Sequence, residues 1–556
     1  MERLHSTSYP WWKRVTFYQI YPRSFCDSNG DGIGDLPGII SKLDFIKELG
    51  YNVVWFSPFY KSPQFDHGYD ISDYRDIAPE YGTIADCERL IKEMHDRDIK
   101  IVLDMVLNHT SHEHPWFLES KSTRDNPKRD WYIWRDGRKP KGKKPPNNWW
   151  GITLGSAWHY DTTTEQWYYA AFLPEQPDLN WRNDVVKQEM FDTLRFWLRK
   201  GVDGFRLDII NSIYEEADVT KNKPLFHPYK YNLNHPDTFQ LVKELRGITD
   251  EFSSPERFLV GEVSGPLPLI KKYYGEAITP VKAKNLHLAF HPQTLRVGFS
   301  ARAYRQLFTR MEAEFAEPCI PTLLSTNHDR MRRISRLGND VRKAKVSATF
   351  QLTARGVPFV YYGEEIGMIQ DYIPTKHAQD PMAQKYRWVP QWGVNVIARK
   401  ILKETLNRDE CRTPMQWDAS PNAGFSKEGV KTWLPVTRGY EKINVAVEEP
   451  DQESLLNCYK RLLHLREVHP ALNSGTFALM GIKDGPSTLL AYERATTESG
   501  QPETLQGFLN FGKKNVKCQV PRALEKVVFS THQNTSPIQE KAINLEPFEG
   551  IIVQLK

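Results

Sequence analysis

The 556-residue chain lacks several features that would place it in a specialised class of protein. Its six cysteines are scattered with no Cys-x-x-Cys spacing, which excludes a disulfide scaffold and indicates free thiols in a reducing compartment. No run approaches the roughly 18 apolar residues of a membrane-spanning helix, and the first ten residues carry no apolar signal core. We therefore predict a cytoplasmic location and no membrane contact.

The chain also has little net charge. The 74 Lys and Arg residues exceed the 69 Asp and Glu residues by only five, a surplus too small to indicate nucleic-acid binding. What the chain does have is a 40% apolar fraction, enough for a large core, and 16 tryptophans. Indole rings either pack in the core or present flat faces to ligands, among them sugars.

Short apolar segments typical of strands recur along the chain, with helical periods between them. Residues 40–49 and 85–96, for example, carry apolar side chains at three- and four-residue spacing. Alternating strands and helices favour a parallel sheet, and eight such units favour a closed (β/α)8 barrel. The predicted strands are residues 17–21, 52–56, 100–106, 204–209, 257–263, 286–290, 322–327 and 358–362.

Two stretches break this pattern. Residues 110–172 are polar and rich in Trp and Pro, which predicts an excursion after the third strand. We expect most of its seven tryptophans to pack that excursion. From Gly475 onward, short strands alternate with turn residues, which predicts a small antiparallel β domain. The predicted division is 1–109 and 173–474 for the barrel, 110–172 for the insertion and 475–556 for the C-terminal domain.

Three carboxylates stand at the ends of predicted strands. Asp208 ends the fourth strand, Glu262 the fifth and Asp329 the seventh. Side chains at the carboxyl ends of barrel strands point into the active-site mouth, where burial shifts their pKa values. Arg206 lies on the same strand face as Asp208 and is expected to hold it ionised at neutral pH, as a nucleophile requires. Singly, each carboxylate has an alternative interpretation as a cap or ion pair; together they predict a catalytic site.

Two histidines occupy similar positions. His109 ends the third predicted strand, and His328 directly precedes Asp329. A lone histidine is more often structural, but two at strand ends of one barrel favour contacts with a ligand.

With these residues in place, the chain resembles the α-amylase superfamily of retaining glycoside hydrolases, glycoside hydrolase family 13, in its oligo-1,6-glucosidase and α-glucosidase branch. The resemblance runs from about Phe17 to the end of the chain. It implies a (β/α)8 TIM barrel, an inserted domain B after strand three and a C-terminal antiparallel β-sandwich. The motifs that carry it are Asp104-Met-Val-Leu-Asn108-His109, Gly204-Phe-Arg206-Leu-Asp208, Gly261-Glu262-Val, Asn327-His328-Asp329, Gln176-Pro-Asp-Leu-Asn180-Trp and Arg412-Thr-Pro-Met-Gln-Trp417.

The resemblance also implies a role for each site residue. Asp208 would be the nucleophile that forms a covalent glucosyl-enzyme, Glu262 the general acid/base and Asp329 the transition-state stabiliser. Retaining chemistry needs the first two carboxyls roughly 5–5.5 Å apart. The residues expected to bind the sugar at subsite −1 are Asp66, Tyr69, His109, Arg206, His328 and Arg412.

One pair of these residues bears on the mode of cleavage. In pocket-type relatives an Asp and an Arg clamp the non-reducing end, which implies removal of one glucose at a time. Asp66 matches that Asp. For the Arg, we prefer Arg412 to Arg408 because Arg412 opens the family motif. The ligand is then a small oligosaccharide, bound by a monomer or homodimer.

A second loop predicts a metal site. Its oxygen-bearing residues alternate, with Gly32 allowing a sharp turn, much as in the first half of an EF-hand loop. The twelfth position is Gly38 instead of Glu, so the loop is not an EF-hand. By the resemblance we expect a structural Ca2+ (or Mg2+) away from the catalytic centre, held by Asp27, Asn29, Asp31, Ile33 and Asp35.

Linkage preference is predicted from Ile209, the residue after the nucleophile. In the resembling branch, Val there goes with α-1,6 preference and Ala or Thr with α-1,4, so β-branched Ile209 favours α-1,6 linkages such as that of isomaltose. An α-1,4-preferring maltase or transglucosylase remains an alternative. So does a trehalose-6-phosphate hydrolase, with the basic run from Lys139 to Lys144 as a phosphate site.

Two further activities are disfavoured by what the chain lacks. A non-catalytic interaction module of the transporter heavy-chain type needs a transmembrane helix and usually loses the catalytic carboxylates. A sucrose isomerase carries an Arg-Leu-Asp-Arg-Asp motif, which is not found after the sixth strand.

Overall fold

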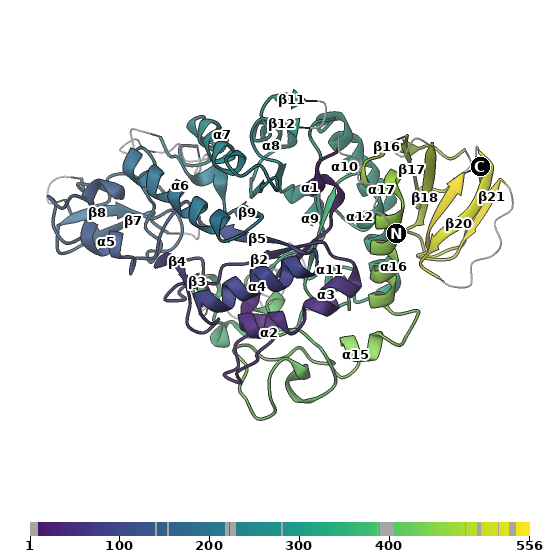
Figure 1. Ribbon diagram of the computed structural model, residues 1–556, viewed down its shortest axis with the longest axis horizontal. Helices are drawn as coiled ribbons and strands as arrows, with labels where there is room; N and C mark the ends of the chain where they lie inside the picture. The colour runs from purple at the N-terminus through teal and green to yellow at the C-terminus, as the bar shows by residue number, and fades with distance from the viewer. Residues whose placement is uncertain are drawn as a thin grey trace.

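The structure is a computed structural model that describes residues 9–138, 142–152, 155–216, 222, 230–279, 282–385, 387, 389, 405–483, 485–497, 502–520, 522–532 and 541–555. Its centre is one sheet of eight parallel strands (Figure 1). In chain order the strands are β1 (Phe17–Ile20), β2 (Val53–Phe56), β5 (Lys100–Met105), β9 (Gly204–Leu207), β10 (Phe258–Gly261), β13 (Leu288–Ala289), β14 (Thr322–Leu324) and β15 (Val357–Tyr361). Each lies within a predicted strand or differs from it by one residue, so the predicted barrel is confirmed.

Neighbouring barrel strands follow the order of the chain. The sheet runs β14-β15-β1-β2-β5-β9-β10-β13, which leaves β14 and β13 as its two ends. Side chains bridge these ends: the Thr322 hydroxyl donates to the Ala289 carbonyl at 2.9 Å and accepts the His291 N–H at 3.2 Å. The His291 ring in turn accepts the Thr322 N–H at 3.3 Å. Two polar side chains therefore close the barrel where the strand ladder is not continuous.

The barrel strands are apolar on both faces because side chains fill the interior and helices cover the outside. Aromatic rings dominate the interior, where Phe17 stacks on Phe359 with ring centroids 4.2 Å apart. The predicted helical segments form α3 (Leu43–Leu49) and α4 (Ile84–Asp96), and α4 begins with a Thr83–Asp86 capping box. The longer helices are α3 (Leu43–Leu49), α4 (Ile84–Asp96), α6 (Asp184–Arg199), α7 (Asp237–Asp250), α10 (Ala301–Glu314), α12 (Val341–Thr353) and α16 (Leu455–Val468).

Residues of the predicted insertion form a small separate layer. Helix α5 (Pro115–Ser120) lies beside a three-stranded sheet of β6 (Trp134–Arg135), β8 (Gln166–Tyr169) and β7 (Trp158–Asp161). As expected, most of its tryptophans pack: Trp149 and Trp158 are each 1% exposed, whereas Trp150 is 55% exposed.

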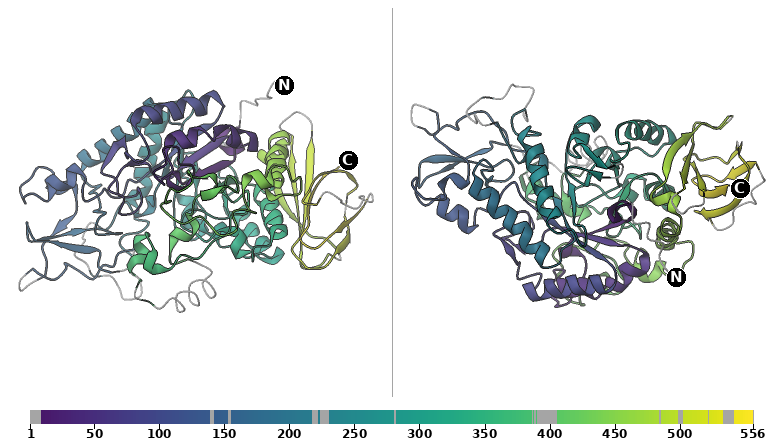
Figure 2. Two further views of the ribbon diagram at one scale, coloured as in Figure 1. Left: turned by 90° about the horizontal axis from the view of Figure 1, so that it is seen from below. Right: turned by 45° about the horizontal axis from the view of Figure 1, so that its top comes forward.

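The C-terminal residues form an antiparallel sheet in the order β16 (Thr476–Met480), β17 (Leu489–Thr496), β18 (Glu503–Asn510), β22 (Gly550–Leu555) and β20 (Leu524–Ser530). A two-stranded sheet of β19 (Val516–Gln519) and β21 (Ala542–Leu545) shares one apolar cluster with it, which makes the predicted sandwich. This sandwich and the insertion lie at opposite ends of the barrel in every view (Figures 1 and 2). Among the helices of the described residues, none is long and apolar enough to cross a membrane.

Candidate active site

Two of the three predicted catalytic carboxylates lie at the carboxyl ends of neighbouring barrel strands. Asp208 directly follows β9, and its N–H donates to the Met105 carbonyl at 3.0 Å. Glu262 directly follows β10, and its N–H donates to the Leu207 carbonyl at 2.9 Å. Each residue thus continues the parallel ladder by one more hydrogen bond. The strands therefore fix the backbone positions from which both side chains project.

Arg206, on β9, joins three acids with one guanidinium. Its Nη1 donates to both oxygens of Asp104 at 2.8 and 3.0 Å and to Asp208. Its Nη2 donates to Glu262. The Arg206 side chain is 1% exposed, whereas those of Asp208 and Glu262 are 10% and 29% exposed. The guanidinium thus lies beneath the two carboxylates, which face the opening of the site.

The protonation of this cluster differs from expectation. Burial raises the pKa of Asp208 well above its ordinary value; Arg206 lowers it, and Glu262 and Asp104 raise it further. Burial likewise raises the pKa of Asp104 to about 6. Three carboxylates thus share the one positive charge that the prediction assigned to Asp208 alone. Burial and this sharing oppose the expected ionisation of Asp208, so the cluster holds protons more readily than isolated carboxyls do.

Asp329 lies in a different electrostatic setting. Burial alone would raise its pKa, but His328, Arg408 and Arg412 hold that pKa well below the ordinary value. Arg412 Nη2 donates to Asp329 Oδ1 at 2.9 Å, and Arg408 Nη1 donates to the same oxygen at 3.3 Å. Asp329 is therefore the carboxylate that stays ionised, as a stabiliser of positive charge must be.

His328 is neutral and held in one tautomer. Burial lowers its pKa to about 3. The Gln19 amide donates to His328 Nδ1 at 2.7 Å, so Nε2 carries the proton. Nε2 faces the Tyr69 hydroxyl at 2.8 Å and Asp329 at 3.2 Å, and Tyr69 passes a hydrogen bond on to Asp104 at 3.1 Å. Gln19 and Asp104 are site residues whose roles the sequence did not reveal.

The loop that carries Asp66 and Tyr69 lies between β3 (Tyr60–Lys61) and β4 (Asp73–Ile77) and is braced from two sides. Gln176 Nε2 donates to the Tyr69 carbonyl at 3.3 Å and to Asp66 at 3.4 Å. His109 Nε2 lies 3.0 Å from the same carbonyl, and burial lowers the pKa of His109 to about 4. His109 therefore supports the backbone of this loop and stays neutral.

Arg408, not Arg412, contacts Asp66. Arg408 Nη2 donates to Asp66 Oδ1 at 2.7 Å, and its Nη1 reaches Asp329. Arg412 is fully buried, and its Nε donates to the His328 carbonyl at 2.9 Å. The structure thus places Arg408, the alternative to the preferred Arg412, beside Asp66, and it places Arg412 against His328 and Asp329. The 3-10 turn η6 (Arg408–Cys411) lies between the two arginines and directs only the first of them toward Asp66.

Ile209 has a left-handed backbone, with φ of 36° and ψ of 41°. This conformation is strained for a β-branched residue, and strain of this kind gathers at functional sites. The Ile209 N–H faces Glu262 Oε2 at 3.4 Å. The backbone of Ile209 therefore lies beside both predicted catalytic carboxylates.

The predicted metal loop is closed by its own hydrogen bonds. Asp27 accepts the Gly30 and Gly32 N–H groups at 2.7 and 2.8 Å, and Asp35 accepts the Gly38 N–H at 2.6 Å as the N-cap of α2 (Leu36–Ile40). The carboxylate and amide oxygens suit a hard cation such as Ca2+ or Mg2+. Within the described ranges, however, no group of three or more His, Cys, Asp or Glu side chains gathers at one point.

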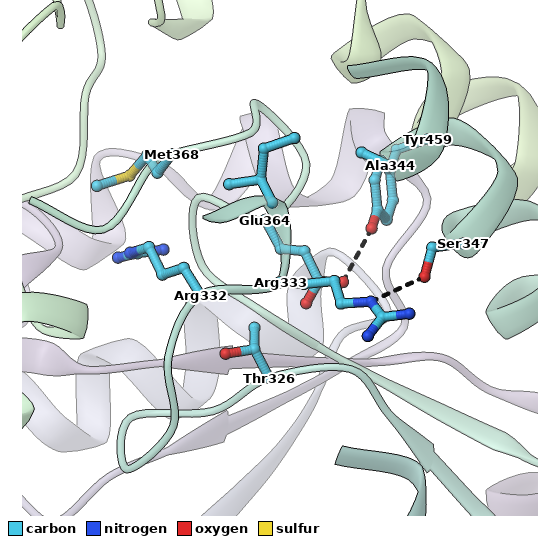
Figure 3. Close-up of a pocket in the computed structure, with 9 residues that line it drawn as sticks. Thr326, Arg332, Arg333, Ala344, Ser347, Glu364, Met368 and Tyr459 are labelled. Atoms are coloured by element: carbon cyan, nitrogen blue, oxygen red, sulfur yellow. Dashed lines mark hydrogen bonds between the residues drawn. The ribbon is translucent and has the colours of Figure 1, made fainter. Parts of the chain in front are cut away.

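A small internal cavity lies beside the segment that carries His328 and Asp329 (Figure 3). Thr326, Arg333 and Glu364 line it; Glu364 accepts from Tyr459 at 3.1 Å, and Arg333 donates to Ser347 at 3.1 Å. Its volume of about 10 Å³ is water-sized. This cavity is too small for a sugar.

Comparison with known proteins identifies the class. A model of the α-amylase catalytic domain matches residues 19–475. The chain therefore belongs to the α-amylase family.

Similarity to individual proteins extends over the whole chain. It is 38% identical to the oligo-1,6-glucosidase of Parageobacillus thermoglucosidasius, over 98% of this chain and 99% of that protein. It is 35% identical to the α-glucosidase of Schizosaccharomyces pombe, over 98% of each. Among solved structures, the isomaltulose synthase PalI from Klebsiella sp. LX3 superposes with a TM-score of 0.88 at 34% identity, covering 98% of this chain and 99% of that one.

Proposed function

We propose that this glycoside hydrolase of the α-amylase family is a retaining exo-α-glucosidase that favours α-1,6 linkages. One observation carries the chemistry: Arg206 joins Asp208 and Glu262, at the ends of adjacent strands, through its two terminal nitrogens. The oligo-1,6-glucosidases that match the chain from end to end support the linkage. The substrate is a short α-glucoside.

In the first chemical step, Glu262 gives a proton to the glycosidic oxygen while the carboxylate of Asp208 attacks the anomeric carbon, so the carbon–oxygen bond breaks and a glucosyl ester forms on Asp208. Glu262 then takes a proton from water, whose oxygen attacks the same carbon and releases Asp208. Both steps pass through an oxocarbenium-like state. The ionised Asp329 stabilises that positive charge.

The position of Arg408 supports removal of single glucose units. Its guanidinium contacts both Asp66 and Asp329, so these three side chains form a charged wall that extends from the Asp66 loop to the catalytic centre. A non-reducing glucose placed against this wall meets a carboxylate and a guanidinium that suit its hydroxyl groups. A chain that continued beyond that glucose would meet the same wall.

A substrate panel tests this function. We expect kcat/KM for isomaltose to exceed that for maltose by about 10-fold or more, because Ile209 restricts the leaving sugar. Ile209→Ala should narrow that ratio by about 10-fold while an aryl α-glucoside is still cleaved. A clear preference of the natural protein for maltose would contradict the linkage assignment.

The same panel separates the alternatives. A dominant rate with trehalose-6-phosphate would indicate the phosphate-recognising hydrolase; residues 139–141 of the basic run proposed for it lie outside the described part of the chain. Conversion of sucrose to isomaltulose or trehalulose would indicate a sucrose isomerase; two of the solved relatives are named isomaltulose synthase and trehalulose synthase. We expect hydrolysis of isomaltose to exceed both.

Arg408→Gln is expected to raise KM for all α-glucosides and to lower kcat/KM by about 100-fold, because a charged hydrogen-bond donor to Asp66 and Asp329 is lost. Steady-state kinetics on isomaltose and an aryl α-glucoside measure the effect. Arg438→Gln is the matched control, since Arg438 pairs with Asp371 while its side chain is 83% exposed. Equal kinetics of the Arg408 and Arg438 variants would refute the clamp.

We also propose that the loop from Asp27 to Asp35 binds one structural Ca2+ or Mg2+. The support is its set of carboxylate and amide oxygens at alternate positions, which match the ligands that these ions prefer. Asp27 is 6% exposed and also accepts a hydrogen bond from Ser426, so an ion held there would fasten two segments far apart in the chain. Its contribution would be to stability.

Chelation is therefore expected to lower the melting temperature by several degrees, and excess Ca2+ or Mg2+ should restore it, because a ligand bound only to the folded state stabilises that state. Differential scanning calorimetry with and without EDTA measures the change. Asp27→Asn should remove the response to the ion. A melting temperature indifferent to both chelator and ion would exclude the site.

The cysteine thiols bear on the cellular compartment of the protein. All six cysteines are free and buried, which supports our proposal of the reducing cytoplasm. We propose a monomer or homodimer, which sedimentation of the purified protein would distinguish.

A further inference from the structure

Asp380 is a buried acid that contacts Arg408 with both of its oxygens. It directly precedes α13 (Pro381–Lys385) and is 0% exposed. Its Oδ1 accepts from Arg408 Nε at 3.1 Å and from Nη2 at 2.8 Å. Its Oδ2 accepts from the Arg408 backbone N–H at 2.8 Å. One carboxylate thus holds the backbone and the side chain of the same arginine.

The neighbouring acid makes the reciprocal contact. Asp409 Oδ2 accepts the backbone N–H groups of Gln379 and Asp380 at 2.6 and 3.2 Å. The side chain of residue 380 therefore binds the backbone of residue 408, while the side chain of residue 409 binds the backbone of residue 380. These contacts lock together two segments that are 28 residues apart along the chain.

We propose that Asp380 is a positioning residue, which fixes the Arg408 guanidinium so that its two terminal nitrogens meet Asp66 and Asp329. This inference rests on the proposed function, because it assigns the device that aligns the sugar clamp. No motif of the sequence pointed to Asp380; its part is visible only from the contacts of Arg408.

The physical need for such a device lies in the arginine side chain. A free Arg side chain loses rotamer entropy when it is held in one conformation. Asp380 imposes that conformation before any sugar arrives, since its partner atoms are Nε, Nη2 and the backbone N–H of one residue. Burial alone would raise the pKa of Asp380, but the opposite effect of Arg408 is larger. The pKa is therefore depressed and the carboxylate stays charged.

Substitution by Asn tests this most finely. Asp380→Asn keeps the volume but removes the charge, and the amide nitrogen replaces one of the two oxygens that accept from Arg408. We expect kcat/KM for isomaltose to fall by about 10- to 100-fold, mainly through KM. Asp371→Asn is the control, because Asp371 makes a similar carboxylate contact with the exposed Arg438. That variant should keep natural kinetics.

A double-mutant cycle separates positioning from a general loss of structure. If Asp380 acts through Arg408, Asp380→Asn combined with Arg408→Gln should match Arg408→Gln alone to within about twofold in kcat/KM. Independent effects that multiply in the double variant would overturn the proposal, as would natural KM in Asp380→Asn. If Asp380→Asn does not fold, Asp380→Glu takes its place in the cycle, with the same outcomes.

The result also distinguishes this inference from the function on which it rests. Hydrolysis of an aryl α-glucoside by the natural protein is measured first. Absence of this hydrolysis would overturn the proposed function. If the natural protein hydrolyses the substrate and Asp380→Asn has the same kinetics, the positioning role alone is overturned.

Discussion

Asp208→Asn is expected to lower kcat/KM for every α-glucoside by about 10,000-fold or more, because an amide cannot form the glucosyl ester on which both steps depend. The loss should be as large for aryl α-glucosides as for isomaltose, since attack at the anomeric carbon is common to both. Steady-state assays on the two substrates measure it, and a thermal melt verifies that the variant is folded.

Asp203→Asn is the matched control at the other end of the same strand. Asp203 lies just before β9, at the opposite end from Asp208, where it accepts from Lys100 and Arg257 at 3.5 and 3.2 Å. Groups at that end of a barrel serve stability and not catalysis. The control should therefore melt at a lower temperature but keep its kcat. A tenfold loss of turnover corresponds to a rise of about 1.4 kcal/mol in the activation free energy. If Asp208→Asn loses no more than that, Asp208 is ruled out as the nucleophile.

Glu262→Gln is expected to produce the second largest loss, and this loss should depend on the leaving group. General acid catalysis contributes about 100- to 10,000-fold, so isomaltose hydrolysis should fall by that order. A dinitrophenyl α-glucoside needs no protonation to leave, so its first step should be nearly unaffected. The ratio of the two losses is the informative quantity.

The pH profile gives a second readout for Glu262. The acid must be protonated, so kcat/KM of the natural protein should fall as pH rises and the carboxyl cluster loses its proton. In Glu262→Gln that basic limb should disappear for the aryl substrate. An equal loss with both leaving groups, together with an unchanged basic limb, would assign the acid to another residue.

Individual strands and site residues show how much of the fold and the site could be predicted from the sequence. The barrel strands were predictable because both faces of a parallel strand are buried, so Asn52-Val-Val-Trp-Phe56 reads as an apolar run in the printed sequence. Asp208 and Glu262 were predictable because they directly follow such runs. Position along a strand is a local property, and the sequence records it.

Contacts between distant loops were not predictable in the same way. Arg408 and Arg412 are four residues apart, and only the geometry of the intervening 3-10 turn decides which reaches Asp66. Asp380 has no motif at all. The electrostatic setting of Asp208 was not predictable for a related reason: Arg206 was assigned to Asp208 alone, whereas folding brings Asp104 and Glu262 to the same guanidinium.

The most direct test of the mechanism is to trap the covalent intermediate. A 5-fluoro-α-glucosyl fluoride transfers its sugar to the nucleophile, with loss of fluoride, and its ring fluorine slows the second step. Peptide mass spectrometry after brief exposure should find the fluoroglucosyl ester on Asp208, with one sugar per chain and matching loss of activity. A sugar attached to Glu262 or Asp329, or hydrolysis that proceeds with no adduct on Asp208, would contradict the proposed double displacement.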